Sequence, residues 1–177
     1  MRRPNNFAFI DGVNLHLTYE NLDWKLDYKR LRKFLESKYN VTVAYYFLGN
    51  VKDNSSIVTK LESYTYTTKL KEPSPYPTEE EYCPYCWKVI APELNRYKAD
   101  CDSFLTLTVM SFYDLFDKAV IITSDGDFDE LVKLLIRKDK LRMVFAPCRA
   151  GCSKLLKKAT GDKIAFLDDF KKDLEKN

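Results

Sequence analysis

The sequence predicts a single α/β domain built on a parallel sheet, and three observations lead to this fold class. Short apolar runs that end in Gly, Asn or Asp alternate along the chain with segments of helical periodicity, which is the pattern of a parallel sheet covered by helices. The 177 residues are enough for one domain that buries about 70% of its unfolded surface. Hydrophobic residues make up 45% of the chain, so a disordered protein is excluded.

The N-terminal part of the chain predicts strands and helices in alternation. We expect strands at residues 7–10, 41–48 and 65–70, since each is a short apolar or β-branched run. A helix should begin near Asp27, a suitable N-cap, because Leu31, Phe34 and Leu35 follow at helical spacing. A further helix is expected over residues 54–64.

The C-terminal part repeats this alternation. Asp102 is expected to open a helix, and strands are expected at residues 119–122, 141–145 and 164–167. Phe128, Leu131, Val132 and Leu135 give the i, i+3, i+4, i+7 spacing of a helix, and a short helix is expected near Leu155. We place the domain at residues 1–170, followed by a charged tail at 171–177 that lies within a frayed C-terminal helix.

One segment departs from this pattern. An insertion at about residues 72–98 carries several prolines and a Cys-Pro-Tyr-Cys motif. Because proline removes backbone donors, we expect no regular structure in its proline-rich half.

Composition narrows the function classes. No run is long enough for a membrane span and no signal peptide precedes the first strand, so we expect a cytoplasmic protein without membrane contact. The five cysteines are then reduced, and they indicate metal ligands, redox chemistry or packing more than disulfides. The net charge of +3 does not by itself indicate a nucleic-acid partner.

Carboxylates follow two of the apolar strands. Asp11 and then Asn14 come after the first strand, and Asp125 and Asp127 come after the strand at residues 119–122. Since the carboxyl ends of parallel strands share one edge of the sheet, these groups should lie close together. Two like charges 4 Å apart repel by about 4 kcal/mol at an effective dielectric constant near 20. Such a cluster protonates or binds a cation, and Asp oxygens without histidine favour Mg²⁺ or Mn²⁺ over zinc.

Simpler roles compete with this interpretation. An Asp after a strand is often a turn residue or a helix N-cap, and Asp127 precedes a well-formed helix. The residues from Asp125 to Asp129 also resemble the start of a calcium-binding loop, but Glu130 stands where such a loop needs glycine. Two acidic strand ends together still favour a metal site.

Three motifs resemble those of NYN-domain proteins in the PIN-like nuclease superfamily, with the LabA-like branch the nearest in pattern. They are Phe-Ile-Asp11-Gly-Val-Asn14, Lys-Ala-Asp-Cys-Asp102, and Thr123-Ser-Asp125-Gly-Asp127-Phe. The segment Ala-Tyr-Tyr-Phe-Leu-Gly49 also resembles that branch. The resemblance covers residues 7–167. It implies a Rossmann-like sheet with helices on both faces and a Mg²⁺- or Mn²⁺-dependent ribonuclease site.

Carried over by position, the resemblance implies roles for single residues. Asp11, Asn14, Asp102, Asp125 and Asp127 would form the catalytic set, with the four aspartates holding the metal. Asp100 competes with Asp102 for the middle position, and the spacing to Asp125 favours Asp102. Thr123 and Ser124 would contact the substrate. Thr106 and Thr108 stand where parts of the family have a further acid, which favours a weaker metal site.

The cysteines suggest a second metal site. Cys83 and Cys86 resemble a zinc knuckle, and Cys148 and Cys152 are the natural second pair for a tetrahedral structural Zn²⁺. Cys101 is a substitute ligand or a buried packing residue. Reduced thiols without metal are the main alternative, and a glutaredoxin-like redox pair is disfavoured because the motif follows a proline-rich acidic loop rather than an early strand.

A basic stretch follows the strand at residues 141–145. Its residues are Arg149, Lys154, Lys157 and Lys158, and they could hold a phosphate backbone at the same sheet edge as the acids. Lys69, Lys71, Arg96 and Lys98 could add to that surface. A solvated lysine-rich helix is the alternative for Lys157 and Lys158.

The leading function is therefore a metal-dependent endoribonuclease, with RNA as the expected partner and a homodimer left open. One alternative is a catalytically weak or inactive RNA-binding or interaction module of the same fold. Others are a phosphohydrolase of small molecules, which needs an enclosed pocket, and a thiol oxidoreductase, which needs an exposed Cys83 with a lowered pKa.

Overall fold

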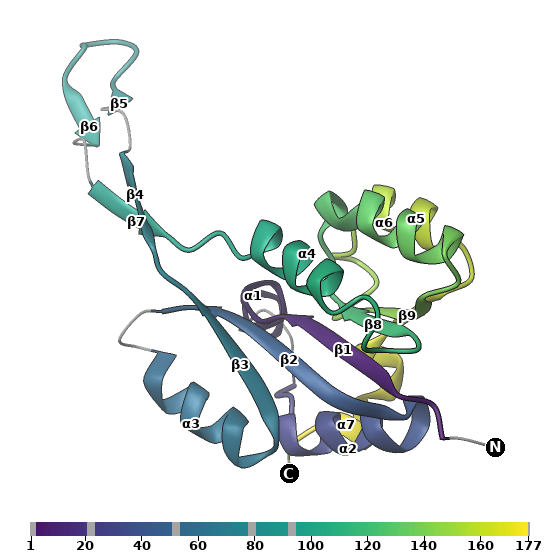
Figure 1. Cartoon of the computed structure of the whole chain (residues 1–177). Coiled ribbons are helices and arrows are strands. Elements are labelled where there is room, and N and C mark those ends of the chain that lie inside the picture. Colours follow the sequence, from purple (N-terminus) through teal and green to yellow (C-terminus); the bar gives the residue numbers. More distant parts are fainter. Residues whose placement is uncertain (1–2, 21–23, 51–53, 78–80, 92–94, 177) are drawn as a thin grey trace.

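The chain folds around one central sheet. The structure is a computed structural model that describes residues 3–20, 24–50, 54–77, 81–91 and 95–176. Among these residues, six strands form a sheet in the order β10-β9-β8-β1-β2-β3, and every neighbouring pair is parallel (Figure 1). The predicted fold class is thereby confirmed.

The elements follow the predicted alternation closely. The strands of the sheet are β1 (Asn6–Asp11), β2 (Val41–Gly49), β3 (Tyr66–Lys71), β8 (Ala119–Ile122), β9 (Leu141–Ala146) and β10 (Ile164–Phe166). The helices are α1 (Gly12–Glu20), α2 (Tyr28–Tyr39), α3 (Ser55–Ser63), α4 (Asp102–Ser111), α5 (Asp129–Arg137), α6 (Lys154–Thr160) and α7 (Lys171–Leu174), with short 3₁₀ turns η2 (Gly126–Phe128) and η3 (Leu167–Phe170). As predicted, Asp27 caps α2 by accepting hydrogen bonds from the backbone N–H groups of Lys29 and Arg30.

Helices cover both faces of the sheet. One core packs α2, α3 and α7 against one face, and a second core packs α4, α5 and α6 against the other (Figure 1). In β1, Ala8 and Ile10 belong to the first core while Phe7 and Phe9 belong to the second. This explains why β1 reads as a continuous apolar run, because a strand buried on both faces has no polar side.

The chain order places a topological switch at the centre of the sheet. From β1 the chain moves outward through β2 to β3, and it then returns to β8 on the other side of β1. β1 and β8 are paired in register, with Ile10 opposite Ile122. The loops after these two strands therefore leave in opposite directions, which opens a crevice at their carboxyl ends.

The proline-rich segment is regular, which corrects the expectation of irregular structure. β4 (Ser74–Pro77) pairs with β7 (Asn95–Lys98) as an antiparallel ribbon, and β5 (Glu81–Tyr82) pairs with β6 (Val89–Ala91) beyond it. In a two-stranded ribbon, alternate backbone nitrogens point away from the partner strand. Prolines at alternate positions, as Pro75 and Pro77 are, can therefore be accommodated. The ribbon projects from the sheet and carries β5 and β6 at its far end (Figure 1).

The C-terminal segment is docked, whereas the sequence suggested a frayed helix. The side chain of Leu174 is buried, and the Asp27 backbone N–H donates to the Leu174 carbonyl at 2.8 Å. The Trp24 indole N–H donates to an Asp168 carboxylate oxygen at 3.0 Å. Phe170 also packs against Phe34 and the first core. Two apolar residues and these hydrogen bonds therefore outweigh the charged composition of the segment.

Helix α1 was not among the predicted elements. Its sequence shows no apolar stripe, which is the signal by which a helix is predicted. Among its described side chains, only Leu15 belongs to the core. No helix in the described part of the chain is long and apolar enough to cross a membrane.

Candidate metal centre

Asp11 and Thr123 meet where β1 and β8 end. Asp11 is the last residue of β1, and Thr123 follows β8 directly. The Thr123 hydroxyl donates to Oδ2 of Asp11 at 3.0 Å, and the Asn14 backbone N–H donates to Oδ1 at 3.1 Å. Asp11 is only 4% exposed, and this burial raises the pKa of its carboxyl group. The carboxylate is thus fixed in position at the bottom of the switch-point crevice.

Asn14 connects the two strand ends. It lies in the first turns of α1, and its Oδ1 accepts hydrogen bonds from the Ser124 backbone N–H at 2.9 Å and the Ser124 hydroxyl at 2.7 Å. The Thr123 hydroxyl also accepts a hydrogen bond from the Asp125 backbone N–H at 3.1 Å. These bonds hold the loop after β8 against α1, so the carboxylates on the two segments face one another.

A cluster of carboxylates lies at this edge. Oxygen atoms of Asp102, Asp125 and Asp127 all lie within 4.8 Å of one another. Burial, and next the negative charges of Asp11 and its other acidic neighbours, raise the pKa of Asp102 to about 6. Asp102 and Asp125 are half-buried and Asp127 is exposed, so the cluster is open to solvent on one side.

Two of the acids also accept hydrogen bonds from backbone N–H groups where helices begin. The Asp125 carboxylate accepts from the Asp127 backbone N–H at 3.0 Å and is the N-cap of η2, and the Asp100 carboxylate accepts from the Asp102 backbone N–H at 3.2 Å. Asp127, which the simpler sequence interpretation made the cap of the helix after it, does not cap α5, whose N-cap is Phe128. The positive ends of the helices that begin here favour negative charge, which offsets part of the repulsion.

Asp102 and Asp100 take different places. The carboxylate of Asp102 belongs to the cluster with Asp125 and Asp127, whereas Asp100 is exposed and its carboxylate accepts a hydrogen bond from the Asp102 backbone N–H. This arrangement agrees with the preference for Asp102 as the middle carboxylate. Thr108 does not reach the cluster, because its hydroxyl donates to the Phe104 carbonyl within α4.

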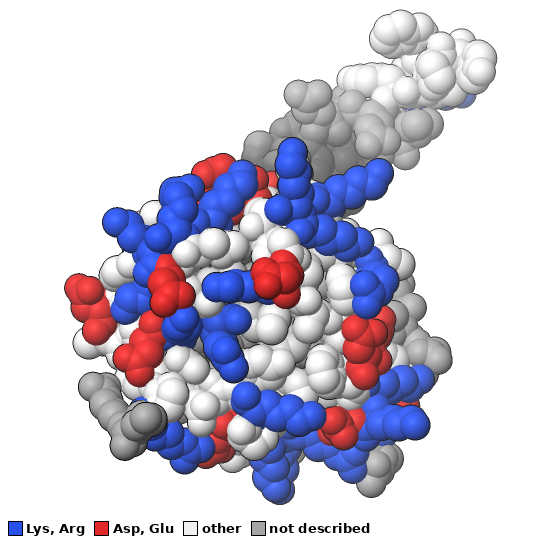
Figure 2. Space-filling view, turned by 90° about the vertical axis from the view of Figure 1, so that its right-hand side faces the viewer, with Lys and Arg blue, Asp and Glu red and all other residues white. Residues whose placement is uncertain are grey.

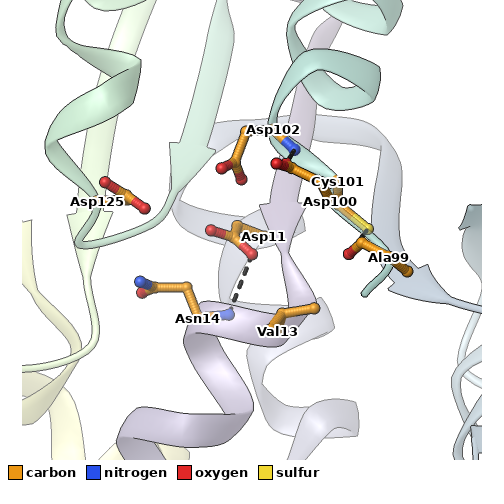
Figure 3. Close-up of a pocket in the computed structure, with 8 residues that line it drawn as sticks. All are labelled: Asp11, Val13, Asn14, Ala99, Asp100, Cys101, Asp102 and Asp125. Atoms are coloured by element: carbon orange, nitrogen blue, oxygen red, sulfur yellow. Dashed lines mark hydrogen bonds between the residues drawn. The ribbon is translucent and has the colours of Figure 1, made fainter. Parts of the chain in front are cut away.

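A pocket of about 180 Å³ brings these residues together. Figure 3 shows Asp11 at its centre, with Asp102 above it, Asp125 to one side and Asn14 below. Three neutral residues, Val13, Ala99 and Cys101, also line the pocket. They lie within the acidic motifs, but sequence reasoning assigned none of them to this site.

The donor set fits a hard divalent cation. The cluster offers carboxylate oxygens from Asp102, Asp125 and Asp127, and Asp11 adds a further carboxylate to the same pocket. The raised pKa of Asp102 reflects the cost of gathering like charges, which a bound cation would relieve. All-oxygen ligands are typical of Mg²⁺ and Mn²⁺ sites.

The residues proposed to contact substrate fall into two groups. Thr123 and Ser124 are buried, and their hydroxyls bond to Asp11 and Asn14. Arg149 instead lies over the Phe166 ring at 4.1 Å and pairs with Asp169 at 3.2 Å, and the Lys157 ammonium donates to the Arg149 carbonyl at 2.8 Å.

Other lysines lie at the carboxyl edge of the sheet. Lys154 and Lys158 are exposed on α6, and Ser153 before α6 donates its backbone N–H to the Ser124 carbonyl at 3.0 Å. Lys71 ends β3 and is close enough to Cys101 for its charge to lower the pKa of that thiol, although burial raises the pKa to about 11 overall. On the side of the molecule that carries α5 and α6, Lys and Arg predominate over Asp and Glu (Figure 2).

The four-cysteine zinc site expected within one chain is not formed, which corrects that prediction. Cys83 and Cys86 lie between β5 and β6 at the end of the ribbon, whereas Cys148 and Cys152 are buried between β9 and α6. All five cysteines are free, and the four proposed ligands do not gather into a metal-binding group among the described residues. The ribbon directs the first pair away from the sheet (Figure 1).

The buried cysteines have structural environments. The Cys148 sulfur accepts from the Gly151 backbone N–H at 3.3 Å, and burial raises the pKa of Cys152. Cys101 is buried in the core beside α4, as a packing residue would be. By contrast, the backbone N–H groups of Tyr85 and Cys86 lower the pKa of Cys83.

Comparison with known proteins identifies the family. Residues 7–167 match the NYN domain. The chain is 24% identical over 181 residues to Low amplitude and bright protein LabA of Synechococcus elongatus, covering 98% of this chain and 90% of that protein. A crystal structure of a protein of unknown function from Vibrio parahaemolyticus has a TM-score of 0.70 and 19% identity, covers 99% of both chains and shows the same fold. With this match over most of its length, the chain belongs to the NYN domain family and is LabA-like.

Proposed function

We propose that this protein is a metal-dependent endoribonuclease whose active site is the acidic pocket at the end of β1 and β8. The observation that carries the proposal is the convergence of Asp102, Asp125 and Asp127 beside buried Asp11 at the topological switch point. NYN domains belong to the PIN-like nuclease superfamily, and this membership supports a hydrolase.

In this proposal the acids hold the metal and the polar neighbours position the acids. Asp11, Asp102, Asp125 and Asp127 bind Mg²⁺ or Mn²⁺. When bound, such an ion supplies positive charge that polarises a phosphate and makes water more acidic. The Thr123 hydroxyl keeps Asp11 oriented, while Asn14 fixes Ser124 and thereby the loop that carries Asp125. Thr123 and Ser124 are therefore positioning residues more than substrate contacts.

A polymeric substrate suits the surroundings of the pocket. Asp127 and Asp100 are exposed, so the acidic site opens to solvent on this side and is not a closed cavity. A phosphohydrolase of small molecules would need an enclosed pocket, and this open arrangement does not favour that alternative. Lys71, Lys154 and Lys158 lie on segments at the same edge of the sheet and provide positive charge for an RNA backbone.

Cleavage of a mixed set of labelled RNAs tests the proposal. The wild-type protein and Asp11→Asn would be compared in Mn²⁺, Mg²⁺ or EDTA, after circular dichroism has shown that both are folded. We expect cleavage that requires metal and is lost in the variant. RNA binding without cleavage by either protein would favour the inactive binding module. Absence of both binding and cleavage would contradict the nucleic-acid function altogether.

A further inference from the structure

The tip of the ribbon is a closed turn that carries two thiols. Cys83 and Cys86 lie between β5 and β6. The Cys83 backbone N–H donates to the Lys88 carbonyl at 2.8 Å, and the Trp87 N–H donates to the Cys83 carbonyl at 2.9 Å. Trp87 has φ of 54°, a left-handed conformation that costs a residue with a side chain roughly 1–2 kcal/mol. The turn therefore holds Trp87 in a backbone conformation that is unfavourable for a residue with a side chain.

This backbone shape orients amides toward sulfur. The backbone N–H groups of Tyr85 and Cys86 both donate to the Cys83 thiol, and the Cys86 thiol is a further partner of Cys83. Amide donors directed at a Cys-x-x-Cys pair are the environment of a thiolate that binds a soft or borderline metal. Two thiolates occupy only two of the four positions of a tetrahedral zinc ion.

The described part of the same chain does not supply the other two ligands. Cys101 is buried in the pocket beside α4, and Cys148 and Cys152 are buried between β9 and α6. His16, the chain's single histidine, lies on α1. Among the described residues, no group of three or more possible metal ligands includes either cysteine of the tip.

The surface around the two thiols is aromatic and exposed. Tyr85 is 95% exposed and Trp87 is 78% exposed, and Tyr82 and Val89 flank them with about half of their surface exposed. The described part of the tip is mostly uncharged, with Lys88 as its basic residue (Figure 2). Large exposed aromatic side chains in one place are typical of an interaction surface.

We propose that Cys83 and Cys86 from two copies of this chain bind one zinc ion, so that the ribbon tips form a zinc-linked homodimer. A two-fold axis through the ion would give four thiolates from two identical turns, which is the self-complementary geometry of an isologous interface. Zinc displaces the protons of the thiols on binding, so assembly releases protons. Tyr85 and Trp87 of each copy pack around the ion in the interface.

Zinc stoichiometry and molecular mass together test this proposal. The full chain would be reduced, stripped of metal and titrated with Zn²⁺ against a chromophoric chelator, with mass followed by analytical ultracentrifugation. We expect about 0.5 zinc per chain and a doubling of mass that EDTA reverses. Co²⁺ in place of zinc should give the visible absorption of a tetrahedral four-thiolate site.

Variants separate this site from the others in the molecule. Cys83→Ser should abolish zinc binding and dimerisation, whereas Cys148→Ala with Cys152→Ala should leave both unchanged. Asp125→Asn serves as the control for zinc held by the acidic pocket. One zinc per monomeric chain, loss of zinc in the Cys148/Cys152 variant, or a Cys83–Cys86 disulfide with no zinc affinity would each overturn the proposal.

Discussion

At the scale of single residues, Asp11 and Asp125 have structural partners as well as their proposed ligand role. Asp11 accepts from Thr123 and from the backbone of Asn14, and Asp125 caps the turn that carries Asp127. The acidic residues themselves could be predicted from sequence, because they follow apolar strands. Their hydrogen bonds could not, since they depend on the register that sets Ile10 beside Ile122.

Asp102→Asn should stabilise the metal-free protein. The folded state raises the pKa of Asp102 from 3.8 to about 6, so the folded protein binds a proton more tightly than the unfolded chain. The contribution of Asp102 to stability is therefore most favourable below about pH 4 and falls as the pH rises toward 6. After allowance for solvent screening, we expect the variant to gain about 1 kcal/mol at pH 7 in EDTA and almost nothing at pH 4.

Chemical denaturation at the two pH values measures this effect. Asp129→Asn is the matched control, because Asp129 pairs with Lys133 at 2.7 Å and should not gain stability when it is neutralised. Added Mg²⁺ should then stabilise the wild type more than Asp102→Asn. A variant that is less stable than the wild type at pH 7 in EDTA would show that the carboxylates do not repel one another as we infer.

Thr123→Val should weaken both the fold and the metal site. The buried Thr123 hydroxyl donates to Asp11 and accepts from the Asp125 backbone N–H, so valine leaves two buried polar groups without these partners. We expect a loss of about 1–3 kcal/mol in unfolding free energy and weaker Mn²⁺ binding. Urea unfolding and a Mn²⁺ titration check this, with Thr123→Ser retaining most of both properties. If the serine and valine variants had equal unfolding free energies and equal Mn²⁺ affinities, the Thr123 hydroxyl would not contribute to either property.

At the scale of elements, the junction of β1 and α1 decides where Asp11 and Asn14 lie. Gly12 joins the strand to the helix against Tyr46 and Phe47 of the neighbouring strand β2. A Cβ atom built on Gly12 would overlap the Tyr46 ring and the Phe47 carbonyl oxygen. The Phe47 carbonyl belongs to a strand paired on both sides, so moving it would disturb the hydrogen bonds of the sheet.

Gly12→Ala should therefore displace the whole β1–α1 junction. We expect the free energy of unfolding to fall by about 1–3 kcal/mol. We also expect the folded variant to bind Mn²⁺ more weakly than the wild type, beyond what the unfolded fraction alone would cause. Thermal unfolding and Mn²⁺ titration measure the two effects. Gly151→Ala is the comparison, because its added Cβ would meet only the Cys148 sulfur at 3.2 Å. Normal metal affinity in folded Gly12→Ala would mean that the junction does not position the acids.

The elements also show where sequence reasoning works and where it stops. The central strands β1 and β8 could be predicted because their burial on both faces demands continuous apolar residues. The ribbon could not, because prolines are acceptable in β4 only when a partner strand leaves alternate nitrogens unpaired. The docked C-terminus depends on Phe170 and Leu174, two apolar residues in a charged segment whose partners lie more than a hundred residues away in the sequence.

At the scale of the whole molecule, the topology creates the site and the ribbon stands apart from it. The switch between β1 and β8 gathers acids that are more than a hundred positions apart in the sequence. The two cysteine pairs are closer in sequence, 62 to 69 positions apart, yet the ribbon separates them in space (Figure 1). Spacing of residues along the chain therefore predicts proximity only where the sheet order is also known.

The identity of the RNA ends after cleavage is the measurement that tests the central claim most directly. Hydrolysis by water leaves a phosphate on one end and a free hydroxyl on the other, without the 2′,3′-cyclic phosphate that attack by the ribose 2′-hydroxyl produces. We expect such hydrolytic ends with Mn²⁺ for the wild type and for Asp129→Asn, and no product for Asp125→Asn. Cyclic phosphate ends, or cleavage that survives both EDTA and Asp125→Asn, would contradict a metal-dependent nuclease in this pocket.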